Sequence, residues 1–185
     1  ILKISKNRNL IESKTNCIVM VDEVRNVQIT DDKYETHLFL KKNGFDTPNT
    51  CIPSTKEVVY EMIDTVGFPF IVKKRVAQGS KNIRIINSHR EARECIGEED
   101  YILQEYLHTD NNEITAGVYL SDAGDVIGLC TFFRELRSGS TFKAKRIVNP
   151  NIDSYLEKVA KRLGMKYVNI QGRLKNNRLY IFELN

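Results

Sequence analysis

Apolar side chains recur every third or fourth residue in four segments of the chain, and this spacing predicts four helices. The pattern is clearest in residues 151–163, where Ile152 and Leu156 share one face and Gly164 follows the last turn. The other predicted helices span residues 31–43, 54–66 and 88–96.

Polar residues with the chemistry of helix caps precede three of these segments. Asp31 or Asp32 can accept hydrogen bonds from the free backbone N–H groups at the start of one helix. Ser54 and Ser88 are each followed three residues later by Glu, which is the spacing of a capping box. Gly67 follows the second helix, as expected of a residue that ends it.

Short apolar or alternating runs between turn-forming residues predict strands. The predicted strands span residues 18–21, 68–74, 83–86, 101–107, 113–120, 126–133, 141–148, 166–174 and 178–185. The first 30 residues otherwise have no clear pattern. Helices and strands mix without β-α-β alternation, so the predicted class is α+β. A chain of 185 residues can form one good core or two small subdomains.

Composition and charge exclude several classes of protein. Hydrophobic residues make up 41% and charged residues 28%, as in an ordinary globular protein. No apolar run approaches the ~18 residues of a transmembrane helix, and no signal peptide is recognisable, so no membrane partner is expected. The net charge of +4 suits an anionic ligand but is too small to predict nucleic-acid binding. The chain begins with Ile rather than Met, which indicates an excised fragment.

The four cysteines lie far apart and have no CxxC spacing. They stand at positions 17, 51, 95 and 130. This spacing argues against a zinc site and against a disulfide framework. Reduced thiols in a cytoplasmic protein are therefore expected.

The last two predicted strands carry polar side chains whose meeting depends on the register. Side chains alternate between faces along a strand, so the length of the loop decides which residues face each other. A two-residue loop at 176–177 sets Gln171 opposite Phe182, with Glu183 on the other face. A three-residue loop at 176–178 sets Gln171 opposite Glu183 instead, and Asn tolerates the left-handed conformation that such a loop needs.

The second register also sets Asn169 opposite Asn185, so that four oxygen-bearing side chains share one face of two strands. Carboxylate and amide oxygens on a rigid base are ligands that Mg²⁺ takes, usually together with water and phosphate oxygens. A polar sheet surface facing solvent would give the same pattern, and spacing does not separate the two interpretations.

Two other segments have residues suited to a nucleotide. Lys73 ends a predicted strand before a loop with Gly79 and Ser80, which could offer an ammonium and backbone N–H groups to phosphate, although no Walker motif is present. The strand at 101–107 runs into a polar hinge whose free backbone groups could bind a purine edge, and Glu113 could accept hydrogen bonds from ribose. A solvated basic hairpin and an exposed turn are the alternatives.

A third segment, RELRSGS at 134–140, reads as a basic loop. Arg134, Arg137 and Lys143 lie in or beside it and could neutralise a transferred phosphoryl group, although a solvated loop is equally consistent. The three histidines are isolated, and no GxSxG or HExxH motif is present.

Taken in order, these motifs resemble the ATP-grasp superfamily, especially its carbamoyl-phosphate-synthase-like branch. The resemblance covers roughly residues 31–185. It rests on four stretches: DKYETHLFLKKNGFDTP, FPFIVKK with its Gly loop, ILQEYL with the following Glu, and NIQGRL…YIFELN. Each stretch alone is weak, but the ordered set is specific.

The resemblance implies two α+β subdomains that hold ATP between them. The expected division is a remnant or linker at 1–30, an N-terminal subdomain at 31–106 and a C-terminal subdomain at 107–185 that is cut short. Members activate a carboxylate as an acyl phosphate, which an amine, ammonia or a thiol then attacks. The implied cofactors are ATP and Mg²⁺ or Mn²⁺. The implied substrates are a small carboxylate and an amine.

The resemblance also implies a role for individual residues of this chain. Lys33 and Lys73 would contact phosphates, and Gly79 and Ser80 would lie in a lid loop. Adenine would be contacted at Gln104, Glu105 and Leu107, and the ribose by Glu113. Metal would be bound by Gln171, Glu183 and Asn185, and phosphate or substrate would be contacted by Arg137 and Lys143. The first metal position, often acidic in the family, is the amide Gln171 here. The domain that usually comes before this one is missing, so turnover by the fragment alone is not expected.

Two other functions remain compatible with the sequence. A nucleotide-binding module without chemistry would bind ATP but would not release ADP in response to a carboxylate. General binding of anions or RNA would depend strongly on salt and would not select a nucleotide. Dispersed basic residues without interleaved aromatic residues make the RNA interpretation the weakest.

Overall fold

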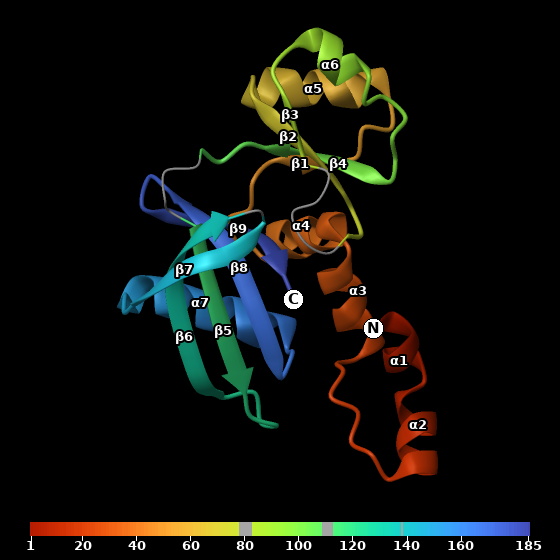
Figure 1. Cartoon of the computed structure of the whole chain (residues 1–185), viewed down its shortest axis with the longest axis vertical. Coiled ribbons are helices and arrows are strands. Elements are labelled where there is room, and N and C mark those ends of the chain that lie inside the picture. Colours follow the sequence, from red (N-terminus) through yellow and green to blue (C-terminus); the bar gives the residue numbers. More distant parts are fainter. Residues whose placement is uncertain (78–82, 109–112, 138) are drawn as a thin grey trace.

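The computed structural model describes residues 1–77, 83–108, 113–137 and 139–185 (Figure 1). Its helices are α1 (Leu2–Lys6), α2 (Arg8–Thr15), α3 (Val24–Asp31), α4 (Lys33–Lys42), α5 (Lys56–Val66), α6 (His89–Arg93) and α7 (Pro150–Leu163). Its strands are β1 (Thr50–Cys51), β2 (Phe70–Lys74), β3 (Arg84–Ile86), β4 (Tyr101–Glu105), β5 (Glu113–Leu120), β6 (Val126–Arg137), β7 (Ser140–Ile147), β8 (Tyr167–Lys175) and β9 (Arg178–Leu184). Two antiparallel sheets with helices packed on them confirm the α+β class.

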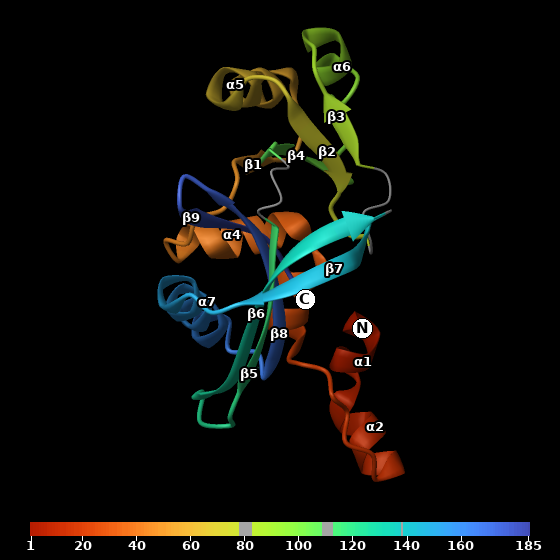
Figure 2. The same cartoon turned by 60° about the vertical axis from the view of Figure 1, so that its left-hand side comes forward.

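The smaller sheet has the strand order β1-β4-β2-β3 and carries α5 and α6 (Figures 1 and 2). Its core contains Phe70 and Val72 from β2, together with Leu103 from β4. These side chains pack against Val59 and Ala92 of the two helices. Because side chains alternate along a strand, the neighbours Ile71, Lys73 and Gln104 point away from this core.

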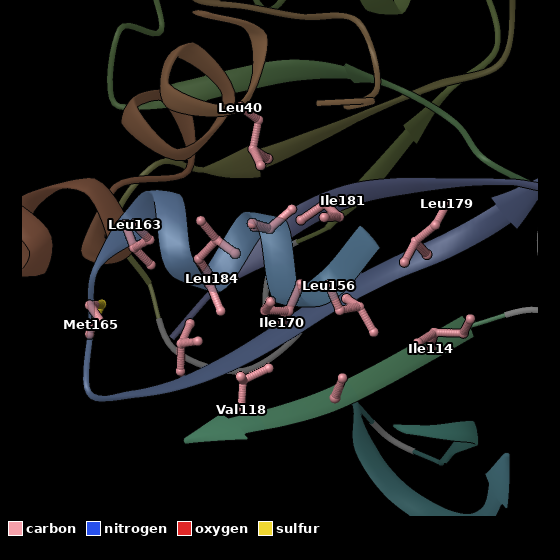
Figure 3. Close-up of a cluster of buried hydrophobic side chains, with 14 of the residues drawn as sticks. Leu40, Ile114, Val118, Leu156, Leu163, Met165, Ile170, Leu179, Ile181 and Leu184 are labelled. Carbon is pink, nitrogen blue, oxygen red and sulfur yellow. The ribbon is translucent and has the colours of Figure 1, made fainter. Parts of the chain in front are cut away.

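The larger sheet has the strand order β7-β6-β5-β8-β9, and α7 covers one face of it. Figure 3 shows Ile114, Ile170 and Leu184 from three neighbouring strands around Leu156 of α7. All four side chains are fully or almost fully buried. The opposite face of β5, β8 and β9 therefore presents the polar residues of the predicted site.

Most helix signals in the sequence are confirmed, but one helix is capped one residue later than predicted. Asp32, and not Asp31, caps α4 by accepting from the Tyr34 N–H at 2.8 Å. The capping box at Ser54 is wrong, because the hydroxyl of Thr55 caps α5 instead. Ser88 caps α6 as expected, and Gly67 and Gly164 follow α5 and α7 with positive φ.

The N-terminal segment differs from its predicted structure. Three helices, α1, α2 and α3, lie within residues 1–31, although the sequence has no clear helical pattern there. The predicted strand at 18–21 is wrong, since none of its residues belongs to either sheet. Ile18 and Met20 are 86% and 75% exposed, so this apolar run does not belong to a buried strand.

The basic loop predicted at 134–140 is also wrong. Residues 134–137 continue β6, and Ser140 already begins β7. Glu135 pairs with Lys143 and Arg137 with Ser140 across the hairpin. The charged residues resemble a loop in the sequence, but cross-strand backbone pairing keeps them in a strand.

The final hairpin combines the two registers that loop length suggested. Its turn holds two residues, Asn176 and Asn177, both with positive φ, which is the shorter of the two loops that the sequence left open. Lys175 therefore pairs with Arg178. A bulge at Phe182 then shifts the register by one residue, and Gln171 lies opposite Glu183 as predicted.

In the described part of the chain, every helix is too short or too polar to cross a membrane.

Candidate functional site

A cleft of about 1370 Å³ lies between the two sheets and extends along the N-terminal segment. Nine of the residues that were given a role in nucleotide or metal binding line it together. They are Lys33, Lys73, Gln104, Glu105, Leu107, Glu113, Gln171, Glu183 and Asn185. They come from α4, β2, β4, β5, β8 and β9 and from the segments directly after β4 and β9. The fold thus brings residues that are up to 152 positions apart, from Lys33 to Asn185, into one cavity.

Two lysines approach the cleft from the side of the smaller sheet. Lys33 begins α4, and its ammonium donates to the carbonyl oxygen of Ala77 at 2.9 Å. Lys73 is only 7% exposed, and burial lowers the pKa of its ammonium to about 8. The charge of Glu183 opposes this shift, whereas Lys33 adds to it. An anion beside this buried ammonium would favour its charged form.

The strand β4 supplies the edge predicted to contact adenine. Gln104 is buried, and its amide donates to Thr50 Oγ1 at 2.9 Å. The Glu105 carboxylate accepts hydrogen bonds from the Lys175 ammonium at 2.6 Å and from the Asn49 side chain at 2.9 Å. Each carboxylate oxygen therefore already has a partner within the protein. The chain leaves the sheet after Glu105, so the backbone groups beyond it form no ladder hydrogen bonds with β1 or β2.

Glu113 lies in a row of charges that crosses three strands of the larger sheet. Its Oε1 accepts from Arg134 Nε at 2.8 Å and Nη2 at 2.6 Å. Its Oε2 accepts from Arg173 Nε at 3.1 Å and Nη2 at 2.7 Å. Arg173 also donates to the carbonyl oxygen of Leu107 at 2.6 Å, which ties this row to the adenine edge. One buried carboxylate therefore holds two guanidinium groups.

The amide groups of β8 continue this network toward the end of the chain. Gln171 Oε1 accepts from Arg134 Nη2 at 2.6 Å, and Gln171 Nε2 donates to Asn169 Oδ1 at 2.8 Å. Asn169 in turn donates to Thr115 Oγ1 at 2.8 Å and exchanges two backbone hydrogen bonds with Asn185. This chain of hydrogen bonds orients the amide side chains on the cleft face.

The bulge at Phe182 gives β9 two consecutive side chains on the cleft face. Ile181 and Leu184 are buried in the core, whereas Phe182 and Glu183 both line the cleft. The Lys73 ammonium lies 5.3 Å from the centre of the Phe182 ring, a cation–π contact. The bulge thus places an aromatic ring and a carboxylate side by side next to Lys73.

The predicted metal ligands form a donor set with a single carboxylate. Glu183 carries the charge, while Gln171 and Asn185 offer neutral amide oxygens. No three His, Cys, Asp or Glu side chains in residues 1–77, 83–108, 113–137 and 139–185 are grouped so that they could hold a metal. Such a set fits Mg²⁺ only where phosphate oxygens and water complete the coordination, which is how this ion usually binds.

The remaining predicted residues lie elsewhere. The Arg137 guanidinium stacks on Phe142, with its Cζ 3.7 Å from the ring centre. Lys143 lies on the exposed strand β7, and its Nζ is 3.9 Å from Oε2 of Glu135 on β6. Neither side chain is among the described residues that line the cleft, so their predicted contact with phosphate or substrate stays a prediction. Gly79 and Ser80 lie outside the described residues.

Sequence reasoning missed Arg173 altogether, and it placed Arg134 in a basic loop and not on the sheet face beside Glu113. Strand alternation contains the information for both. Arg173 stands two residues after Gln171 in the same strand and so shares its face. Arg134 follows Phe133, whose partner across the ladder is Ile114, and this places the arginine beside Glu113.

Comparison with known proteins identifies the class. Residues 30–185 match the family model of the ATP-grasp domain, and the chain belongs to the ATP-grasp family. The resemblance that the ordered motifs indicated is thereby confirmed.

Particular relatives resemble the chain at low identity. It is 28% identical over 198 residues to the uncharacterised protein MG011 of Mycoplasma genitalium, covering 99% of this chain and 64% of that protein. It is 27% identical over 134 residues to a carbamoyl-phosphate synthase of Methanobrevibacter smithii, covering 72% of this chain and 35% of that enzyme. The chain thus spans less than two thirds of the length of these curated relatives.

A solved structure shares the fold. The biotin carboxylase domain of the Hydrogenobacter thermophilus 2-oxoglutarate carboxylase, crystallised with MgADP, ADP and bicarbonate, superposes with a TM-score of 0.78 at 20% identity. The match covers all of this chain and 45% of that one. This likeness confirms the ATP-grasp fold.

Proposed function

We propose that this chain is the ATP- and Mg²⁺-binding domain of an ATP-dependent ligase that joins a carboxylate to an amine or a thiol. The proposal rests on one observation above the others. The cleft gathers Lys33 from α4, Lys73 from β2 and Glu183 from β9, and these are the charges that a metal-bound triphosphate needs around it. Membership of the ATP-grasp family supports the same reading.

Each group of the cleft has a task in this proposal. Lys33 and Lys73 neutralise phosphate oxygens, and Glu183 with Asn185 holds Mg²⁺. The backbone next to Glu105 and Leu107 contacts adenine, and Glu113 contacts the ribose. Bound Mg²⁺ would neutralise charge on the phosphates as phosphoryl transfer proceeds.

The proposed reaction has two steps. A carboxylate oxygen of the substrate attacks the γ-phosphorus of ATP, the bond to the bridging oxygen breaks, and ADP leaves. The product is an acyl phosphate. The amine nitrogen or thiol sulfur then attacks the acyl carbon, phosphate leaves, and the nucleophile loses a proton. The relative that suggests an amine nucleophile is the carbamoyl-phosphate synthase, whose resemblance covers part of that enzyme.

The test measures ADP release from Mg-ATP by the purified full-length protein across a panel of carboxylate and amine pairs. At least one pair is expected to stimulate release, and Glu183→Ala is expected to abolish the stimulated rate. Glu99→Ala, at an exposed position in the turn before β4, is the matched control and should retain it. Full turnover by the Glu183 variant would refute the metal assignment. Nucleotide binding without any stimulated release would indicate a binding module instead of a ligase.

A further inference from the structure

The amide oxygen of Gln171 has a partner that is hard to reconcile with a metal. It accepts a hydrogen bond from Arg134 Nη2 at 2.6 Å. The same guanidinium donates through Nε and Nη2 to Glu113 Oε1, at 2.8 and 2.6 Å. The Arg134 side chain is only 13% exposed, so it is anchored on two sides within the sheet face.

The row of charges around Arg134 carries a surplus of positive charge. Arg134 and Arg173 both bond Glu113, and that one carboxylate neutralises only one of them. Both guanidinium groups line the cleft in which we place the nucleotide phosphates. A guanidinium presents planar N–H donors that match phosphate oxygens well.

A divalent cation on Gln171 would meet this charge at close range. It would share the amide oxygen with a guanidinium nitrogen, and like charges at such a distance repel strongly. The neutral amide supplies no charge to offset the repulsion. Glu183, directly opposite on β9, does supply a negative charge.

We propose that Arg134 takes the place of one divalent cation in this cleft, and that Gln171 is the residue that positions its guanidinium. This inference rests on the proposed function. One divalent cation then binds per nucleotide, through Glu183 and Asn185, and the Arg134 guanidinium neutralises the phosphate oxygens that a second cation would otherwise contact. Gln171 acts through Arg134 and is not a metal ligand.

The test counts Mn²⁺ bound to the purified protein in the presence of one equivalent of a non-hydrolysable ATP analogue. The loss of the free Mn²⁺ signal in electron paramagnetic resonance gives the count directly and does not depend on turnover. We expect one Mn²⁺ per bound nucleotide. Two would overturn the inference while leaving the proposed function intact, whereas failure to bind the nucleotide would refute the proposed function itself.

Two pairs of variants separate the roles of the residues. Gln171→Leu should keep the Mn²⁺ affinity within about twofold, whereas Glu183→Gln should lower it at least about tenfold, as expected for losing a charged ligand. An equal loss in both variants would contradict the inference.

Arg134→Gln should weaken nucleotide binding about tenfold, and Arg146→Gln, on the exposed strand β7, should leave it unchanged. If the Arg134 variant bound nucleotide normally, or if Arg146→Gln weakened binding equally, the guanidinium would have no such role.

Discussion

Gln171 on β8 lies directly opposite Glu183 on β9, although the turn between these strands holds two residues and not three. The bulge at Phe182 makes both facts possible. Near the turn the register follows the short loop, and beyond the bulge it is shifted by one residue. The alignment of the two cleft residues therefore depends on an irregularity within the strand and not on the turn.

Gly172 should tolerate no side chain at the position where β8 meets this bulge. A Cβ there would lie 2.5 Å from the carbonyl oxygen of Tyr180 and 2.9 Å from the Leu179 side chain. Gly172→Ala is expected to lower the free energy of unfolding by about 1–3 kcal/mol, as overpacking does. Urea denaturation measures this change.

Gly117→Ala is the matched control for that experiment. Gly117 lies in the neighbouring strand β5, and a Cβ there would have no atom within 4 Å. This variant should be as stable as the wild type or slightly more stable. Equal destabilisation of both variants would show that loss of strand glycine, and not the close approach to Tyr180, is responsible.

The two-residue turn predicts opposite effects for two substitutions at Asn177. Asn176 and Asn177 have φ of 52° and 60°, as a type I′ turn requires. Asn177→Gly should raise the free energy of unfolding by up to about 1 kcal/mol, because glycine adopts positive φ without steric cost. Asn177→Val should lower it by about 1–2 kcal/mol. Thermal unfolding followed by circular dichroism would detect the difference, and the reverse order would contradict the turn assignment.

Lys73 should reduce stability at neutral pH. Its pKa is lowered to about 8 from 10.5 by burial, so the folded state binds this proton more weakly than the unfolded state does. The free-energy penalty for burying charged Lys73 is absent above pH 10.5, and it grows as the pH drops toward 8, so the protein becomes less stable over this range. Lys73→Met should therefore stabilise the protein by on the order of 3 kcal/mol at pH 7, with the gain vanishing near pH 10.5.

The neighbouring residue supplies the control for Lys73. Lys74 is exposed, and Lys74→Met should change the free energy of unfolding by no more than about 0.5 kcal/mol at either pH. The measurement is chemical denaturation at pH 7 and pH 10. A gain that did not depend on pH would mean that the methionine stabilises by packing and not by removing a buried charge.

Nucleotide binding should be accompanied by proton uptake at alkaline pH. A phosphate beside Lys73 favours its charged form and raises its pKa from about 8. Between pH 8 and 10 the bound state then holds a proton that the free state has partly lost, so affinity should fall as the pH rises through 8. Calorimetric titration in two buffers of different ionisation enthalpy measures this uptake. Lys73→Met should abolish it.

Much of the fold could be predicted because local chemistry decides it. The helix at 150–163 and its Gly164 end follow from apolar spacing and a glycine with positive φ. The strand at 113–120 follows from alternation, since Ile114 and Val118 face the core. Helices α1 to α3 escaped prediction because they are short and their apolar residues are few, and Val27 is the one apolar residue among them that is buried.

The sequence pointed to several residues that line the cleft, but it did not predict the hydrogen bonds between them. Lys33, Glu113 and Glu183 were named from motifs, and all three line the cleft. The bonds of Glu113 to two arginines depend on which strands are neighbours, and strand order follows from packing of the whole sheet. Arg134 looked like a loop residue because a charged stretch usually lies in solvent, but backbone pairing with β7 keeps it in β6, where its guanidinium bonds the buried Glu113.

The bulge at Phe182 also has a consequence for comparing sequences. The turn and the cleft end of this hairpin have separate registers, so a relative without the bulge would match this chain only if a one-residue gap were placed at position 182. A gap placed at the Asn176-Asn177 turn instead would align Leu179 and Ile181 with residues of the opposite face. An apparent change of core residues along this strand would then be an artefact of where the gap was put.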